Sequence, residues 1–179
     1  MNIKRLIALL IIIAVTVSMA SCGNNTEKEV PEGMAYITNE AVDFGFCYPM
    51  EWSVDRNEGM ISVKVANASG GESNASISVS AVTLKEQISA KEYWETLKTA
   101  FDGAFKELTV ITADETKVAD IPAYRVHYTA ILTESVYHFV TVTVVYRGTA
   151  YKIVFTATEA DYNTYSSAVD SVINNFEFK

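Results

Sequence analysis

Two histidines, His127 and His138, are the only imidazoles in this chain that could act as general bases. A nucleophilic enzyme places such a base beside its Ser, Cys or Thr, yet the sequence contains no Gly-x-Ser-x-Gly elbow. When Leu132 is paired with Val136 in a predicted hairpin, the two histidines fall on opposite faces of the sheet. The pattern therefore predicts that they share no site, and it favours a locally hydrogen-bonded, structural role for His138.

The residue types also give little indication of a site for a metal, a cofactor or a phosphate group. Two cysteines and two histidines are too few for a zinc framework. The segment Asp55–Gly59 has oxygen ligands at alternating positions but lacks the later ligands of an EF-hand loop. Asp114, Glu115 and Asp120 could hold a cation only weakly, because acidic turns are usually solvated. We therefore expect no cofactor, no metal site and no catalytic residue.

Aromatic residues are the remaining candidates for binding. Tyr and Trp suit interfaces because an apolar ring carries a polar edge, although packing on their own sheet is the preferred interpretation here. The candidate interaction surface consists of Tyr48, Trp52, His127, Tyr137 and Phe139. Cys47, which lies in the same aromatic stretch, is interpreted as a buried, inert thiol rather than a reactive one.

The N-terminus carries the most specific motif of the chain. Two basic residues precede the apolar run Leu6–Val17, which is shorter than the roughly 20 residues that a membrane-spanning helix needs. This pattern is typical of a secretory signal. The run ends in Ser18-Met19-Ala20-Ser21-Cys22, which resembles the lipobox of bacterial lipoproteins. The resemblance implies that residues 1–21 are removed and that the Cys22 thiol carries a diacylglyceryl group. The alternative is an ordinary signal peptide with a chance cysteine.

The residues after the signal predict an anchored protein with an acidic surface. Residues 22–34 would form the lipidated cysteine and a flexible tether, because Gly23–Gly33 is polar and charged. Two acyl chains, at about 0.8 kcal/mol per buried methylene, hold a protein on a membrane. We therefore expect the chain on the extracytoplasmic face of the cell membrane, or on an outer membrane if the host has one. The net charge of −8 argues against nucleic-acid partners.

Residues 35–179 are predicted to form one α+β domain. Ser89 and Glu92 form a capping box for a helix that extends to about Glu107, and a second amphipathic helix follows Thr158. Alternating apolar residues predict strands elsewhere. The strands expected before the last third of the chain are Val42–Tyr48, Trp52–Val54, Ile61–Val65, Ser76–Ser80 and Val110–Val118.

The run Ala123–Thr158 predicts three antiparallel strands in a meander. Pairing Leu132 with Val136, and Tyr146 with Thr149, places the apolar sets of all three strands on one face. The other face mixes polar and apolar side chains and is expected to be partly covered.

This register predicts that two neighbouring side chains, Val142 and Thr141, lie on different faces of the sheet. Val142 would lie in the core and Thr141 on the mixed face. We therefore expect Val142→Asp to abolish folding, because it buries a charge, and Thr141→Asp to be tolerated.

Three short motifs and a C-terminal helix occur in one order along this domain. The motifs are Phe46-x-Tyr48-Pro49-x-x-Trp52, Pro122-Ala123-Tyr124-Arg125-x-x-Tyr128 and Tyr151-x-Ile153-x-Phe155, and the helix ends near Phe176. Together they resemble the PsbP-like family, named for an extrinsic protein of photosystem II, over residues Tyr36 to Phe178. The resemblance implies an αβα sandwich, in which helices cover both sides of a central antiparallel sheet of about six strands, and a use in protein binding.

Three functions of different classes follow from these patterns. The leading hypothesis is a non-enzymatic, membrane-tethered protein-interaction or stabilising module, because the lipobox, the fold resemblance and the missing catalytic constellation agree. The alternative is a lipoprotein that binds a small ligand or a divalent cation, which the acidic loops and negative charge favour. An enzyme of unknown type ranks third. No residue pattern identifies the partner.

Overall fold

The computed structural model describes residues 30–57, 60–65, 75–132 and 134–179. The predicted signal sequence, Cys22 and most of the predicted tether lie outside these residues. Within them the helices are α2 (Ala90–Ala104), α3 (Glu159–Tyr165) and α4 (Ser167–Asn174). The strands are β1 (Met34–Ile37), β2 (Phe44–Pro49), β3 (Trp52–Asn57), β4 (Met60–Val65), β5 (Ser76–Thr83), β6 (Lys106–Val118), β7 (Ile121–Leu132), β8 (Ser135–Tyr146), β9 (Thr149–Thr158) and β10 (Glu177–Phe178).

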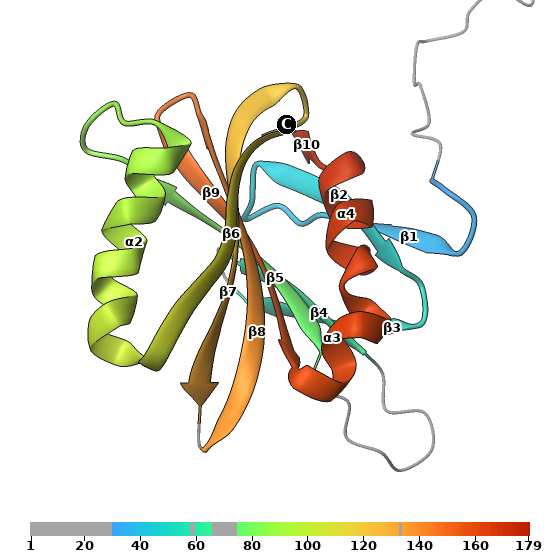
Figure 1. Cartoon of the computed structure of the whole chain (residues 1–179). Coiled ribbons are helices and arrows are strands. Elements are labelled where there is room, and N and C mark those ends of the chain that lie inside the picture. The colour runs from blue at the N-terminus through green and yellow to red at the C-terminus, as the bar shows by residue number, and fades with distance from the viewer. Residues whose placement is uncertain (1–29, 58–59, 66–74, 133) are drawn as a thin grey trace, which may run out of the picture.

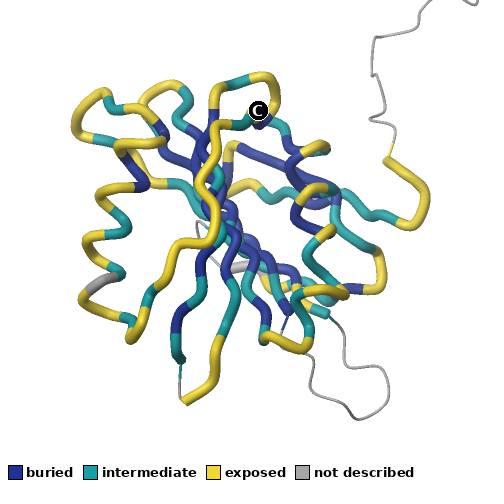
Figure 2. Tube along the Cα trace, viewed as in Figure 1, coloured by how far each residue is buried: buried dark blue, intermediate teal, exposed yellow. Residues whose placement is uncertain are grey.

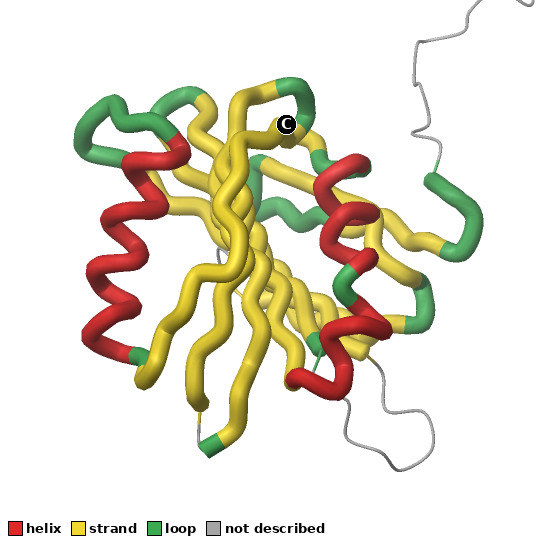
Figure 3. Tube along the Cα trace, in the orientation of Figure 1, coloured by secondary structure: helices red, strands yellow, loops and turns green. Residues whose placement is uncertain are grey.

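The described strands form two antiparallel sheets. The larger has seven strands in the order β3-β4-β5-β9-β8-β7-β6, and β1, β2 and β10 form a second sheet of three. Helices lie on both sides of the strands (Figure 3). The α+β class with helices packed on a central antiparallel sheet is therefore confirmed. The larger sheet has one strand more than the six expected from the sequence.

The two faces of the larger sheet are covered by different elements (Figure 1). Helix α2 contacts β6, β7 and β8, and we call this side the α2 face. Helices α3 and α4 lie on the opposite side together with the small sheet, and we call it the α4 face. The side chains that mark the α2 face are Trp94, Tyr124, Val126, Tyr128 and Phe139. Those that mark the α4 face are Val140, Val142, Ile153, Phe155, Val169 and Ile173.

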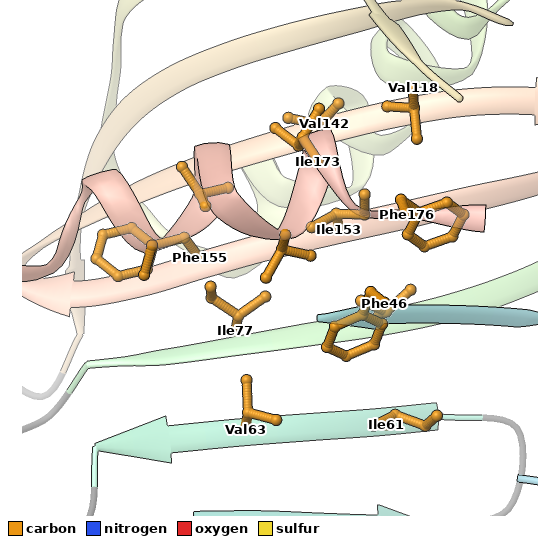
Figure 4. Close-up of a cluster of buried hydrophobic side chains, with 14 of the residues drawn as sticks. Phe46, Ile61, Val63, Ile77, Val118, Val142, Ile153, Phe155, Ile173 and Phe176 are labelled. Atoms are coloured by element: carbon orange, nitrogen blue, oxygen red, sulfur yellow. The ribbon is translucent and has the colours of Figure 1, made fainter. Parts of the chain in front are cut away.

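The core on the α4 face is the larger of the two. Alternate residues of β4, β5, β8 and β9 point into it, and helix α4 places its apolar stripe on them (Figure 4). Phe176 stacks on Phe44 and Phe46 of β2 at ring-centroid distances of 5.7 and 6.5 Å. The small sheet is thereby joined to the same core, since aromatic pairs at these distances are in favourable contact.

Strand β8 is buried on both faces because each face is covered. Its residues Phe139–Val144 are buried in succession, and the central strands of the sheet are dark blue in Figure 2. Thr141 and Thr143 have no exposed surface. Thr141 lies on the mixed face that was expected to be partly covered, but helix α2 covers this face fully at Thr141, so the expectation that Thr141→Asp is tolerated is wrong.

The predicted pairing of β7 with β8 is also wrong, by one residue. Leu132 pairs with Ser135 rather than with Val136. A shift of one residue turns every side chain of one strand to the other face. The apolar residues of β7 therefore face α2, whereas Val140 and Val142 face α4. The pairing of Tyr146 with Thr149 is confirmed.

The helix ends follow the local sequence. Ser89 accepts a hydrogen bond from the Glu92 backbone N–H, and the Glu92 carboxylate accepts one from Ser89, so the predicted capping box is confirmed. Helix α2 ends at Ala104, earlier than expected, and β6 begins two residues later. The predicted C-terminal helix is divided into α3 and α4 at Ser166. No helix in the described ranges is long and apolar enough to cross a bilayer.

Candidate functional site

The shifted register brings the two histidines together. His127 on β7 and His138 on β8 both point to the α4 face, because Thr129 is the residue that pairs with His138. The distance from His127 Nε2 to His138 Nδ1 is 2.9 Å, which is within hydrogen-bond range. The expectation that these histidines lie on opposite faces is therefore wrong, and its cause is the one-residue error in the hairpin.

Helix α3 supplies a partner for each imidazole. The Glu159 carboxylate lies 2.5 Å from His138 Nε2, and the Tyr162 hydroxyl lies 3.3 Å from His127 Nδ1. The Tyr162 ring also stacks on both imidazoles, with centroid distances of 4.7 Å to His127 and 4.4 Å to His138. We call the connected set Tyr162, His127, His138 and Glu159 the histidine chain.

The hydrogen-bond inventory assigns one proton order to the histidine chain. An ionised carboxylate can only accept, so His138 Nε2 donates to Glu159. His138 Nδ1 then accepts from His127 Nε2, and His127 Nδ1 accepts from the Tyr162 hydroxyl. All three contacts are satisfied with both imidazoles neutral.

Burial and neighbouring charges favour this neutral state. Desolvation lowers the pKa of His127, and the charges of His138 and Arg125 lower it further. Arg125 itself forms an ion pair with Asp170 of α4. Burial raises the pKa of the Tyr162 hydroxyl, which keeps this group a hydrogen-bond donor.

The geometry of the histidine chain limits what it can do chemically. A Glu–His pair can activate a hydroxyl or thiol that occupies the far side of the imidazole. Here that position, at His138 Nδ1, is taken by the His127 ring. In the described part of the chain, no group of three or more His, Cys, Asp or Glu side chains is arranged to hold a metal ion. What the arrangement can do is hold protons on the two imidazoles and share them through the hydrogen bonds that connect Tyr162, His127, His138 and Glu159.

A cleft lies on the other side of the molecule, between the start of α2 and the hairpin of β6 and β7. Its volume is about 730 Å³, and its lining is mainly apolar. Lys91 and Lys117 stand at its walls, and Lys91 Nζ lies 5.9 Å from the centre of the Tyr124 ring. We call it the α2 cleft; its apolar lining includes Ile88, Ala90, Ile121, Pro122, Tyr124 and Val145.

A buried threonine fixes one wall of the α2 cleft to the sheet. The Thr143 hydroxyl lies 2.9 Å from the Ala90 carbonyl oxygen and 3.3 Å from that of Tyr124. Because Thr143 belongs to β8, this hydroxyl connects β8 both to the first turn of α2 and to the backbone of β7. A pre-formed cleft needs such fixed walls, because ordering a loose wall on binding would cost affinity.

The five residues of the candidate interaction surface do not form one surface. Trp52 is 5% exposed and packs against Tyr165 in the core of the α4 face. Phe139 is 5% exposed and stacks on Tyr128 at 5.0 Å in the core of the α2 face. These two residues therefore lie in the cores of opposite faces. Tyr48, Tyr137 and His127 are partly exposed.

Sequence reasoning missed the partners of the histidines. Tyr162 and Glu159 fall in the amphipathic helix predicted after Thr158, and the sequence pattern predicts no contact of either with a histidine. Pairing Leu132 with Ser135 would have placed both histidines on one face. Their contact with α3 also depends on the packing of that helix, for which the sequence carries no local signal.

Comparison with known proteins identifies similar chains. Residues 6–178 match the family described as PsbP-like protein. No curated protein matches the sequence. In structure the chain is similar to cyanobacterial PsbP (CyanoP) from Synechocystis sp. PCC 6803. That match has a TM-score of 0.62 and 16% identity, and it covers 90% of this chain and 99% of CyanoP.

Two further solved structures share the fold. The Ran-binding protein Mog1p of Saccharomyces cerevisiae matches with a TM-score of 0.61 and 7% identity, over 81% of this chain and 95% of Mog1p. PA94 of Pseudomonas aeruginosa, described as a putative regulator of unknown function, matches with a TM-score of 0.54 and 14% identity. That match covers 76% of this chain and 91% of PA94. Identities this low establish the fold alone.

Proposed function

Because the chain belongs to the PsbP-like protein family, we propose that it is a membrane-anchored, extracytoplasmic lipoprotein whose domain is a non-enzymatic protein-interaction module. The segment ending in Cys22, which resembles a lipobox, supports both the anchoring and the location on the outer side of a membrane. Mog1p, which shares the fold, is itself a Ran-binding protein, and this supports the use of the fold in protein binding.

The α2 cleft is the observation that carries the interaction role. Its lining is mainly apolar and includes the charged residues Lys91, Glu115 and Lys117, a mixture that suits a protein contact site. Beside it runs β6, one of the two edge strands of the larger sheet, most of which is exposed (yellow in Figure 2). Val110 and Ile111 on this strand are 38% and 50% exposed. An outer strand and an adjacent apolar cleft together suit an extended segment of another protein.

The anchoring is tested by removing the lipidated thiol. Cells grown with a clickable fatty acid should label the wild type and fractionate it with membranes. Cys22→Ser should carry no label and leave the membrane fraction, because it has no other thiol at the lipobox. Cys47→Ala is the matched control, since it removes the chain's other cysteine, and it should keep the label. An unlabelled wild type, or a labelled Cys22→Ser variant, contradicts the proposal.

The interaction role is tested by site-specific crosslinking in cells. A photoreactive residue at Lys91 or Lys117 should capture a defined protein partner, because both side chains rim the α2 cleft. The same residue at Lys64, an exposed lysine of β4 that does not line the cleft, is the control. Equal capture from all three positions, or from none, contradicts a partner at the cleft.

The cleft volume also favours a second function, the binding of a small ligand. A volume of about 730 Å³ lies within the range of roughly 300–1,000 Å³ that is usual for small-molecule sites. Native mass spectrometry of the protein purified from its host would detect a bound molecule at one copy per chain. A small molecule lost on Tyr124→Ala would favour this function over the protein-binding one. The divalent-cation alternative gains no support from the described residues.

A further inference from the structure

Helix α3 is held on the sheet in a different way from α4. None of its seven residues is buried, whereas α4 buries Ala168, Val169, Val172 and Ile173. Its contacts with β8 and β9 include those of the Tyr162 ring and the Glu159 carboxylate, both of which belong to the histidine chain. An element with few buried apolar side chains opens at lower free energy than the rest of a domain.

The histidine chain can accept one proton without losing a contact. When a single proton is added, one imidazole becomes a cation, and its N–H donates to the neutral imidazole across the 2.9 Å contact. The Tyr162 hydroxyl then rotates and accepts from His127 Nδ1, while His138 keeps Glu159 as its acceptor. The carboxylate compensates the new charge.

A second proton cannot be accommodated in this geometry. Both facing nitrogens, His127 Nε2 and His138 Nδ1, would then carry hydrogens, and neither could accept. Two cations would also lie with ring centroids 5.2 Å apart. The rings must separate, and Tyr162, which stacks on both of them, must move with them.

We propose that the histidine chain is a proton-operated latch, in which binding of the second proton releases α3 from the sheet while α4 and the strands remain folded. The proposal is independent of the proposed function, because it depends only on contacts within the domain. Release of α3 would uncover Phe155 and Trp52, two aromatic side chains that it now contacts. The ring centroids are 6.2 Å apart for Tyr162 and Phe155, and 6.0 Å apart for Tyr165 and Trp52.

Other charged or polar groups lie on the elements that are packed around the latch. Arg125 on β7 adds positive charge but is paired with Asp170 of α4. On β6, Asp114 is the partner of Arg125 in the strand register. On α3, Asp161 accepts a hydrogen bond from the Thr158 hydroxyl. On β9, Ala157 pairs with His138, and it adds no titratable group.

The direction of the pH effect follows from the pKa of His127. Burial, His138 and Arg125 lower this pKa below its ordinary value of 6.5. The folded chain therefore binds the last proton more weakly than the unfolded chain does. The stabilisation by the closed latch is complete above pH 6.5, and it is lost as the pH falls from there through the folded pKa.

Hydrogen exchange of the full chain tests the latch. Between about pH 7.5 and pH 4.5, and after correction for intrinsic exchange rates, residues 159–165 should lose protection at least about tenfold. Residues 167–174 should keep theirs. His127→Gln is the matched variant, because its amide N–H reaches the position of Nε2 and can donate to His138 but cannot take up a proton. Its α3 should stay protected at low pH.

A second measurement uses the wild type alone, so its result does not depend on whether a variant folds. In the wild type, the imidazole of His127 should titrate below pH 6.5 when followed by NMR, because burial, His138 and Arg125 lower its pKa. Titration of His127 at or above pH 6.5 overturns the proposal. So does simultaneous loss of protection in α3 and α4, protection of α3 that does not change with pH, or an unchanged response in a folded His127→Gln variant.

Discussion

Gly45, in the central strand of the small sheet, leaves room for a side chain that joins the two outer strands. Tyr36 on β1 reaches across it to Glu177 on β10, with 2.5 Å between the Tyr36 hydroxyl and the carboxylate. Burial, followed by the effect of Glu177, raises the pKa of Tyr36 to about 12. The phenol is therefore protonated and acts as the donor. A side chain at position 45 would occupy the space through which Tyr36 passes.

Gly45→Ala is expected to destabilise the protein by about 2 kcal/mol or more. A Cβ at this position would lie 2.0 Å from the Tyr36 hydroxyl oxygen, so Tyr36 would have to leave Glu177. Chemical denaturation measures the change. Gly103→Ala is the control, because a Cβ there meets nothing within 4 Å and alanine favours a helix. Equal stability of Gly45→Ala and the wild type would show that Tyr36 moves without cost.

At the scale of single elements, α2 has a start that its own sequence specifies. The capping box satisfies backbone N–H groups that the first turn of a helix leaves without intrahelical partners. Helix α4 begins differently: its N-cap residue, Ser166, makes no side-chain capping hydrogen bond. Helix α4 is held by its buried stripe instead.

Ser89→Ala should therefore lower the free energy of unfolding by about 1 kcal/mol. Ser166→Ala should leave it within about 0.5 kcal/mol of the wild type, because no capping bond is lost. Thermal and urea denaturation of both variants compare the two helix starts directly. A larger loss for Ser166→Ala than for Ser89→Ala would contradict this assignment.

Strand β8 yields a second prediction at this scale, which replaces the one made from the sequence. Val142→Asp and Thr141→Asp should both abolish folding, because each buries a charge under a covered face. Thr112→Asp, at an exposed position of β6, should fold normally. Circular dichroism of the three variants provides the test. A folded Thr141→Asp variant would mean that α2 does not cover this face in solution.

At the scale of the whole molecule, the C-terminus completes the core. Phe176 is 5% exposed and contacts Phe44 and Phe46, and β10 then pairs with β2. The backbone N–H of Lys179 donates to the Asp43 carbonyl oxygen at 2.8 Å. The last four residues therefore connect the small sheet to the α4 face.

Deleting residues 176–179 should cost about 3–5 kcal/mol, the range expected for removing a buried Phe. Because small domains are stable by only about 5–15 kcal/mol, the truncated protein should be close to unfolding at physiological temperature. Deleting Lys179 alone should cost less, about 1–2 kcal/mol, because it removes the hydrogen bonds to Asp43 and Asn39 but leaves Phe176 in place. Comparable melting temperatures for the two deletions would contradict this role of Phe176.

The amino-acid sequence alone determined the local features of this protein. The α2 capping box, the turn at Arg147-Gly148 and the pairing of Tyr146 with Thr149 follow from neighbouring residues. Both turn residues have positive φ, 49° and 77°, which suits a two-residue hairpin. Together with the motifs, these signals were sufficient for the α+β class.

The tertiary structure decided which side chains share a face. Strand β8 is buried on both sides, and both sides carry apolar residues, so its sequence pattern fits two registers that differ by one residue. Only the packing of α2 on one face and α4 on the other selects between them. The contact between His127 and His138 and their coverage by α3 follow from that selection, because they join residues of separate elements through space.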